Sequence, residues 1–158
     1  MMQKEPMGMA SGPVNIGNSV MAIKYKGGIL IAADCAVSYG GMKKVKNASR
    51  MATISDNIAY ACSGEMSDFQ EVRKMLQTAH ENDIVQSDGR LFYQAKQYYN
   101  HLSNVLYQRR MKMKPLWVST IMAGVDRESG EQFLGQLDLY GTKVTGKYLL
   151  TGIAAHYC

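Results

Sequence analysis

The carboxylate of Asp34 stands where an acidic side chain needs a partner. It directly follows residues 29–33, which are apolar at every position. Such a run is typical of a central strand that is covered on both faces. An unpaired charge beside a buried strand is strongly unfavourable, so this carboxylate must reach water or bind another group. The alternative interpretation is an ordinary turn residue at the end of the strand.

The cysteines and histidines show no spacing typical of a reactive or metal site. The cysteines are odd in number and lack a C-x-x-C pair, which argues against a disulfide framework or a structural zinc site. The histidines match no ligand pattern such as H-E-x-x-H. We therefore expect no metal, no cofactor and a reducing compartment. These residues are Cys35, Cys62, Cys158, His80, His101 and His156.

Residues 141–148 nearly match a phosphate-binding loop, with Gly141, Gly146 and Lys147 at the required spacing. Tyr148 stands where a serine or threonine hydroxyl would bind magnesium. No helix signal follows, so the helix dipole that supports phosphate binding is missing as well. We interpret this segment as a strand that contains glycine.

Composition and charge indicate one soluble domain. The chain has 158 residues, 46% of them hydrophobic and 20% charged, which is ordinary for a globular protein. Its net charge of +5 raises the possibility of nucleic-acid binding. However, two modest basic groups lack any stacking or zinc-finger pattern, and we expect no nucleic acid. The longest apolar run is far shorter than the roughly 20 residues of a membrane span. We therefore expect no membrane contact and a location in the cytoplasm and nucleus.

Hydrophobic periodicity predicts strands, then two helices, then further strands. Residues 1–17 show neither period and are interpreted as a leader or propeptide-like arm, with the domain occupying residues 18–158. Two helices are expected at about 65–82, with a capping box from Ser67 and Gln70, and from about 91 to 111. This order predicts an α+β fold of two sheets with helices outside. The expected strands are 19–26, 29–33, 43–47, 51–54, 58–62, 117–125, 132–139 and 142–150.

The second predicted helix has aromatic residues on more than one side. This distribution predicts a helix that is buried on one face and contacts another protein on the other. The residues are Phe92, Tyr93, Tyr98, Tyr99 and Tyr107.

Several segments from Asn18 onward together resemble the proteasome beta subunits, which have the N-terminal nucleophile hydrolase fold. Residues 107–117 in particular resemble one non-catalytic subunit type of that family. The resemblance implies a four-layer α-β-β-α sandwich of two antiparallel sheets. The other segments are Gly17-Asn18-Ser19, residues 28–34, 38–40, 47–50, 63–64, 68–70 and 133–135, with Asp138 and Gly141.

The resemblance implies that the catalytic positions are degenerate. Active members use a threonine freed by cleavage after a glycine; its hydroxyl is the nucleophile and its amino group the base. By register this threonine falls at Asn18, after Gly17, and the family's catalytic lysine falls at Arg50. Self-processing should fail, which leaves Gly17 and Asn18 as a remnant of the processing site. We expect Asp34 and Arg50 to remain as a structural ion pair.

The resemblance also implies partners and an activity for the assembly. A non-catalytic beta subunit would contact neighbouring beta subunits and the alpha ring within a threonine-type endopeptidase particle. Two alternatives stay open: an active threonine-type peptidase in a different register, and a free-standing interaction module of the same fold. Ser19 is a poor substitute nucleophile because neighbouring side chains on a strand point to opposite faces. Since family members continue beyond Cys158, we expect the fold to be incomplete at the C-terminus, as in a fragment or a truncated gene product.

Overall fold

The computed structural model describes residues 18–39, 42–45, 47–88 and 93–157. The arm at residues 1–17, including Gly17, lies outside them, as does Phe92. The strands and helices of the described residues are β1 Val20–Tyr25, β2 Gly28–Ala33, β3 Val37–Tyr39, β4 Met42–Val45, β5 Met51–Ser55, β6 Ile58–Gly64, α1 Met66–Gln86, α2 Ala95–Met111, β7 Val118–Val125, β8 Gln132–Leu137, β9 Lys143–Thr145, β10 Tyr148–Thr151 and α3 Ala154–Tyr157.

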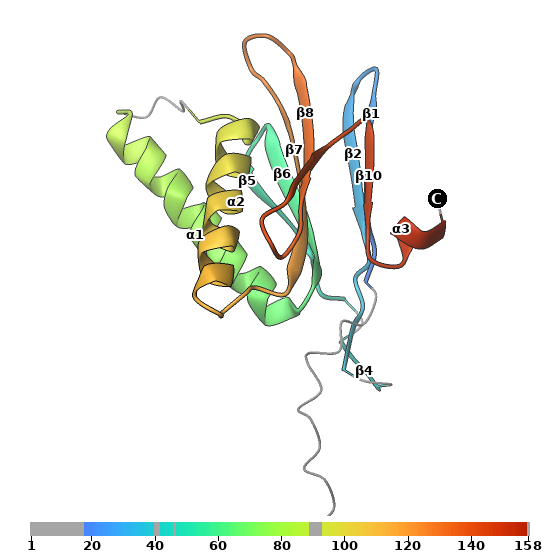
Figure 1. Ribbon diagram of the computed structural model, residues 1–158. Helices are drawn as coiled ribbons and strands as arrows, with labels where there is room; N and C mark the ends of the chain where they lie inside the picture. The colour runs from blue at the N-terminus through green and yellow to red at the C-terminus, as the bar shows by residue number, and fades with distance from the viewer. Residues whose placement is uncertain (1–17, 40–41, 46, 89–92, 158) are drawn as a thin grey trace, which may run out of the picture.

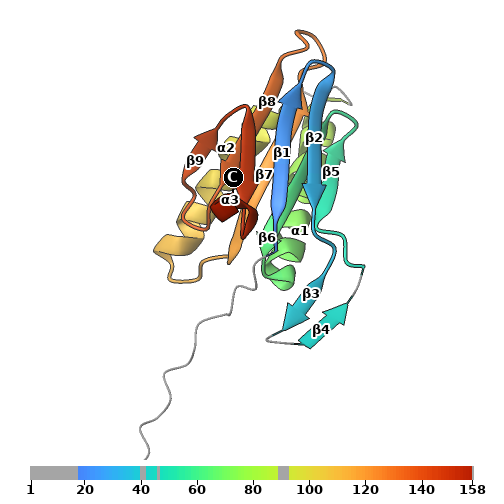
Figure 2. The same ribbon diagram turned by 90° about the vertical axis from the view of Figure 1, so that its right-hand side faces the viewer.

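Two antiparallel sheets pack face to face, and two helices cover the larger one. The larger sheet has the order β5-β6-β7-β8-β9, and the smaller has the order β10-β1-β2. Figure 1 shows α1 and α2 on one face of the larger sheet and the smaller sheet on its other face. A separate β3-β4 ribbon projects from the end of the smaller sheet (Figure 2). The predicted α+β class is confirmed, and the described residues form three of the four expected layers.

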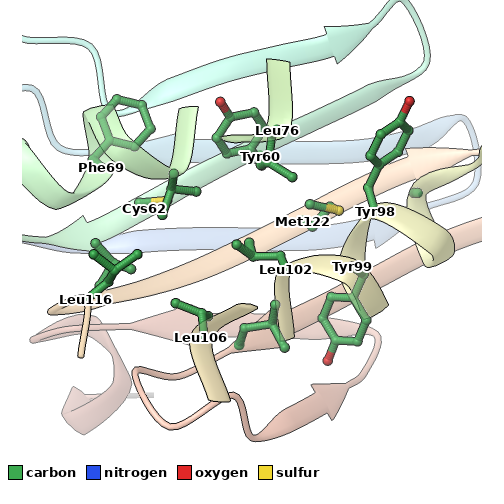
Figure 3. Packing of buried hydrophobic residues seen from close by; sticks show 14 of the residues in the cluster. Tyr60, Cys62, Phe69, Leu76, Tyr98, Tyr99, Leu102, Leu106, Leu116 and Met122 are labelled. Atoms are coloured by element: carbon green, nitrogen blue, oxygen red, sulfur yellow. The ribbon is translucent and has the colours of Figure 1, made fainter. Parts of the chain in front are cut away.

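The molecule has two hydrophobic cores because both faces of the larger sheet are covered. One core lies between this sheet and the helices, where Tyr60 and Met122 face Leu76 and Leu102 (Figure 3). The other lies between the sheets and includes Val20, Ile121 and Leu134. Burial on both faces explains why β6 and β7 consist of nearly continuous buried residues.

The helices were predicted in the right places, but details at their ends differ. The capping box predicted at Ser67 and Gln70 is wrong, because Ser67 Oγ donates to the Glu65 carboxylate instead. Helix α1 continues to Gln86, beyond the predicted end at residue 82. Helix α2 begins at Ala95, where Gln94 and Gln97 form a capping box. Glutamine is uncommon at the first position of this motif, which explains why the pattern was not recognised.

Strand β2 is not the central strand that its apolar sequence predicts. It is an edge strand of the smaller sheet, and among the described residues its side chains are covered on one face. Leu30, for example, is 60% exposed on the opposite face. An apolar run indicates which residues avoid water, but it does not indicate which part of the molecule covers them.

The single strand predicted at residues 142–150 is two strands in different sheets. Strand β9 pairs with β8 in the larger sheet, whereas β10 pairs with β1 in the smaller one. The chain crosses between the sheets at Gly146 and Lys147, and Lys24 N donates to Lys147 O at 2.8 Å. One short segment therefore joins the two sheets covalently, and it is hydrogen-bonded to Lys24 of β1.

Candidate functional site

Asn18 lies two residues before the start of β1 and is only 4% exposed. Its side-chain amide donates from Nδ2 to the carbonyl oxygen of Ala36 at 2.8 Å. The ladder between β1 and β2 extends to this point, because Asp34 N donates to Ser19 O at 3.0 Å. The carboxamide is therefore held in place by the chain that follows β2, and its orientation is fixed.

Asp34 follows the last residue of β2 and is exposed. Its Oδ1 accepts a hydrogen bond from the backbone N–H of Ala36 at 2.7 Å. This side chain to backbone bond, two residues apart, is the Asx turn that aspartate commonly forms at the end of a strand. The carboxylate therefore reaches water, as its position after an apolar run requires, and it also serves as the turn residue of the alternative interpretation.

Arg50 lies immediately before β5 and is only 4% exposed. Cys62 N donates to its carbonyl oxygen at 3.0 Å, and its Nη1 donates to Gly64 O at 2.8 Å. The Nε atom has no hydrogen-bond partner among the described residues. Burial holds the pKa of the guanidinium below its ordinary value, and the negative charge of Asp34 partly offsets this effect.

The predicted ion pair between Asp34 and Arg50 is not formed as a direct contact. Each group has another partner, since the carboxylate caps its own turn and the guanidinium binds the carbonyl of Gly64. The charges influence each other only through space. Within the described ranges, the one ion pair is between Arg109 and Glu71, at 2.9 Å. A carbonyl at a strand end competes well for a buried guanidinium, because it satisfies a donor without burying a second charge.

Cys62 is a buried thiol close to Arg50. Its Sγ lies 3.1 Å from Thr120 Oγ1, and the side chain is fully buried in the interior. Burial raises the pKa of this thiol to about 12. Because the thiolate is the nucleophilic form of cysteine, Cys62 is unreactive near neutral pH despite its cationic neighbour.

Three features that position Asn18 and Arg50 were missed from the sequence. The carbonyls of Ala36 and Gly64 bind the two side chains, and backbone acceptors leave no signal in residue types. Gly152 has a φ of +66° and lies directly against the backbone of Asn18, where a Cβ would clash with the asparagine carbonyl. Glycine readily adopts a positive φ, but the residue type alone does not show which backbone it approaches.

Among the described residues at the amino-terminal end of β1, the side chains of Asn18 and Ser19 form hydrogen bonds with backbone groups. The carboxamide of Asn18 is bonded to a carbonyl, and the hydroxyl of Ser19 accepts a bond from Ala154 N at 3.1 Å. In the part of the chain that the structure describes, His, Cys, Asp and Glu form no group of three that could hold a metal ion. None of the described helices is long and apolar enough to cross a membrane.

Comparison with known proteins gives consistent matches. A family model described as "Proteasome subunit" matches residues 14–158. The chain is similar to proteasome subunit beta type-7 of Saccharomyces cerevisiae, with 35% identity over 96% of this chain and 58% of the relative. It is also similar to beta type-4 of Arabidopsis thaliana, with 36% identity over 91% of this chain and 57% of the relative.

A third relative, beta type-4 of Xenopus laevis, is 32% identical over 96% of this chain and 61% of its own length. The chain thus spans less than two thirds of each of these relatives. Residues 107–117 resemble the subunit called type 4 in mammals, which is the seventh of the eukaryotic beta ring. Both the type-4 and the type-7 names occur among the relatives.

Proposed function

The chain belongs to the proteasome subunit family, and from this premise we propose that it is a non-catalytic, structural beta subunit of a 20S core particle. The observation that carries the proposal is the side chain of Asn18, the residue that the sequence register assigns to the family's nucleophile position. Its amide is buried and bonded to a carbonyl.

The chemistry of asparagine supports this assignment. A threonine nucleophile needs a hydroxyl that can lose its proton to a nearby base as it attacks a carbonyl carbon. A carboxamide nitrogen shares its lone pair with the adjacent carbonyl and is a poor nucleophile at neutral pH. Asn18 would therefore neither cleave a peptide nor attack the bond that precedes it, so Gly17 and Asn18 would stay joined unless another protease separates them.

Arg50 also supports an inactive site. The lysine that it replaces in the family register can exchange a proton when its pKa is lowered, whereas a guanidinium stays protonated. Here the guanidinium is bonded to Gly64 O, across the end of the β5-β6 hairpin. Arg50 thus holds two strands together and is not available as an acid or base.

The role that follows is assembly. The subunit would form part of the wall of a stacked-ring particle, in contact with neighbouring beta subunits and with the alpha ring. Other subunits of that particle would supply the threonine-type endopeptidase activity for ATP- and ubiquitin-dependent protein degradation. We place the subunit in the cytoplasm and nucleus, with no cofactor, nucleic acid or membrane partner.

Native size and covalent labelling test the proposal together. The tagged chain is isolated from its own cells after treatment with a threonine-directed covalent probe, and is separated under native conditions. We expect it in a large particle whose other subunits carry the probe while this chain does not. Label on this chain would show an active peptidase, and migration as a monomer would show a free-standing module; either result overturns the proposal.

A gain-of-function experiment tests the residue register. The double variant Asn18→Thr with Arg50→Lys restores both groups of the active family members, whereas Asn18→Thr alone retains the guanidinium. We expect cleavage after Gly17 in the particle only for the double variant, seen by intact mass as loss of the first 17 residues. The control Asn18→Ala should stay intact, and cleavage of this control would show that the nucleophile lies elsewhere.

A further inference from the structure

The carboxyl-terminal end of α2 contains a Schellman motif with an unusual residue in it. Met113 N donates to Arg110 O at 2.9 Å, and Lys114 N donates to Arg109 O at 3.0 Å. These two bonds define the motif, in which the residue after the C-cap takes a left-handed conformation. Glycine is preferred at that position, but here it is Met113, with a φ of +55°.

The methionine gains no packing that would offset this strained backbone. Its side chain is 88% exposed, although a left-handed conformation is unfavourable for a residue with a Cβ. The other non-glycine residue of positive φ in the described residues is Asp88, whose short polar side chain tolerates this conformation better. Strain without internal compensation is more common at sites of interaction.

Two exposed apolar side chains precede Met113 at the end of α2. Tyr107 and Met111 are one helical turn apart on α2, and they are 52% and 66% exposed. Methionine is flexible and polarizable, so it adapts to apolar side chains of varied shape and is frequent at protein-binding surfaces. The carboxyl-terminal end of α2, which carries these residues, lies at the lower end of this helix in Figure 1, where the chain turns toward β7.

The same segment carries positive charge that no described acidic residue pairs with. Arg109 is paired with Glu71, but Arg110, Lys112 and Lys114 form no ion pair. Two further acidic groups, Asp68 and Asp138, are bonded to backbone N–H groups. Asp68 accepts from Trp117 N, and Asp138 accepts from Tyr140 N.

The guanidinium of Arg110 is exposed and contacts an aromatic ring. It lies over the ring of Tyr140, 4.9 Å from the ring centroid, which orients the cation while its edge stays open to an acceptor. A guanidinium held in this way loses less conformational freedom when it binds a carboxylate.

We propose that this α2-exit surface, defined as Tyr107, Arg110, Met111, Lys112, Met113 and Lys114, binds an acidic segment of another protein. Apolar side chains of that segment contact the methionines, and its carboxylates pair with the three cations. A protein segment fits better than nucleic acid, because the cations are few and Tyr140 is already covered by Arg110. The inference stands on this surface alone and does not depend on assembly into a particle.

Peptide selection tests the charge requirement. A random 12-residue peptide library is selected against the full chain, and the affinity of one recovered labelled peptide is measured by fluorescence anisotropy. We expect selected peptides to be rich in Asp and Glu with interspersed Leu, Phe or Trp. The triple variant Arg110→Glu, Lys112→Glu, Lys114→Glu should bind about tenfold more weakly or worse.

A matched control reverses the same number of exposed charges elsewhere. The triple variant Lys26→Glu, Lys74→Glu, Lys96→Glu should bind the peptide with an affinity within about twofold of the unmodified chain, because these exposed lysines lie outside the α2-exit surface. An equal loss of binding in both triple variants would overturn the proposal, since it would show attraction to net charge only.

Met113→Gly separates binding from a structural role. Glycine relieves the strained φ, so the melting temperature should rise, but the main apolar contact is lost and peptide binding should weaken about threefold to tenfold. The control Asp88→Gly also relieves a positive φ and should leave peptide binding unchanged.

Three other outcomes would overturn the proposal. The first is a selection that yields no acidic sequences. The second is unchanged peptide affinity in Met113→Gly. The third is binding of single-stranded RNA that is tighter than that of the peptide and is abolished by the charge-reversal variant of this surface.

Discussion

Replacing Gly64 by alanine should destabilise the protein strongly, because a Cβ there has no space. Gly64 ends β6 with a φ of +107°, a conformation that side chains rarely adopt. A Cβ would overlap the carbonyl oxygen of Trp117 and lie 3.1 Å from the Cα of Val118. Both obstacles are backbone atoms at the start of β7, which is paired with β6 along its length.

The expected cost combines backbone strain with lost hydrogen bonds. The strained φ costs roughly 1–3 kcal/mol. Moving Gly64 away from Trp117 would also weaken two bonds, from Arg50 Nη1 to Gly64 O and from Glu65 N to Trp117 O. A bond from a charged donor contributes about 1.5–3 kcal/mol, and its loss leaves the buried guanidinium less satisfied. We therefore expect Gly64→Ala to lower the free energy of unfolding by about 3–5 kcal/mol.

Urea denaturation followed by circular dichroism measures this loss. The matched control is Gly130→Ala, because Gly130 also has a positive φ but a Cβ there meets nothing within 4 Å. The control should cost about 1 kcal/mol, from backbone strain alone. If both substitutions cost the same, the close approach of Gly64 to β7 does not determine stability and the reasoning fails.

Three further predictions concern the interior and the surface. Burial raises the pKa of the Cys62 thiol from 9.0 to about 12 in the folded protein. As the pH rises, this thiol therefore ionises in the unfolded chain before it ionises in the folded one. The ionisation of Cys62 should not affect the free energy of unfolding below about pH 9 and should lower it by about 2–3 kcal/mol by pH 11. Urea denaturation at a series of pH values measures this loss, which should be absent in Cys62→Ala. Tyr99→Phe should cost about 1–2 kcal/mol in urea denaturation, because the hydroxyl lies within hydrogen-bonding distance of one carbonyl on β8 and one on β9. Glu71→Gln should cost less than about 1 kcal/mol, because its ion pair with Arg109 is partly exposed, and a larger thermal shift would contradict this.

Much of the fold could be predicted from the sequence because periodicity and turn residues act locally. The helical spacing of Phe69, Val72 and Leu76 placed α1 correctly, and these residues are buried against the sheet. The crossing between sheets at Gly146 could not be predicted, because alternating residues look the same in either sheet. The sequence also did not show which strands β9 and β10 pair with.

The candidate site was predicted only as a set of positions. The family register identified Asn18, Asp34 and Arg50, and the structure describes all three near strand ends. Their hydrogen-bond partners are backbone groups of Ala36 and Gly64. Residue types in a sequence do not show which backbone groups are available as partners. Of the aromatic residues predicted on the second helix, Tyr107 belongs to the proposed α2-exit surface, whereas the strain at Met113 depends on backbone conformation alone.

The crossing from β9 to β10 has a consequence for the order in which the chain folds. Strands β5 to β9 pair mainly with neighbours in sequence, whereas the pairing of β1 with β10 joins Val20 to Thr151. Closing so long a loop is entropically costly, and contacts of this kind slow folding. During synthesis, β1 and β2 leave the ribosome before the other strands, but β1 must wait for β10 before its second edge is paired. The surroundings of Asn18 are therefore expected to form last, after the helices and the larger sheet have already closed their own core.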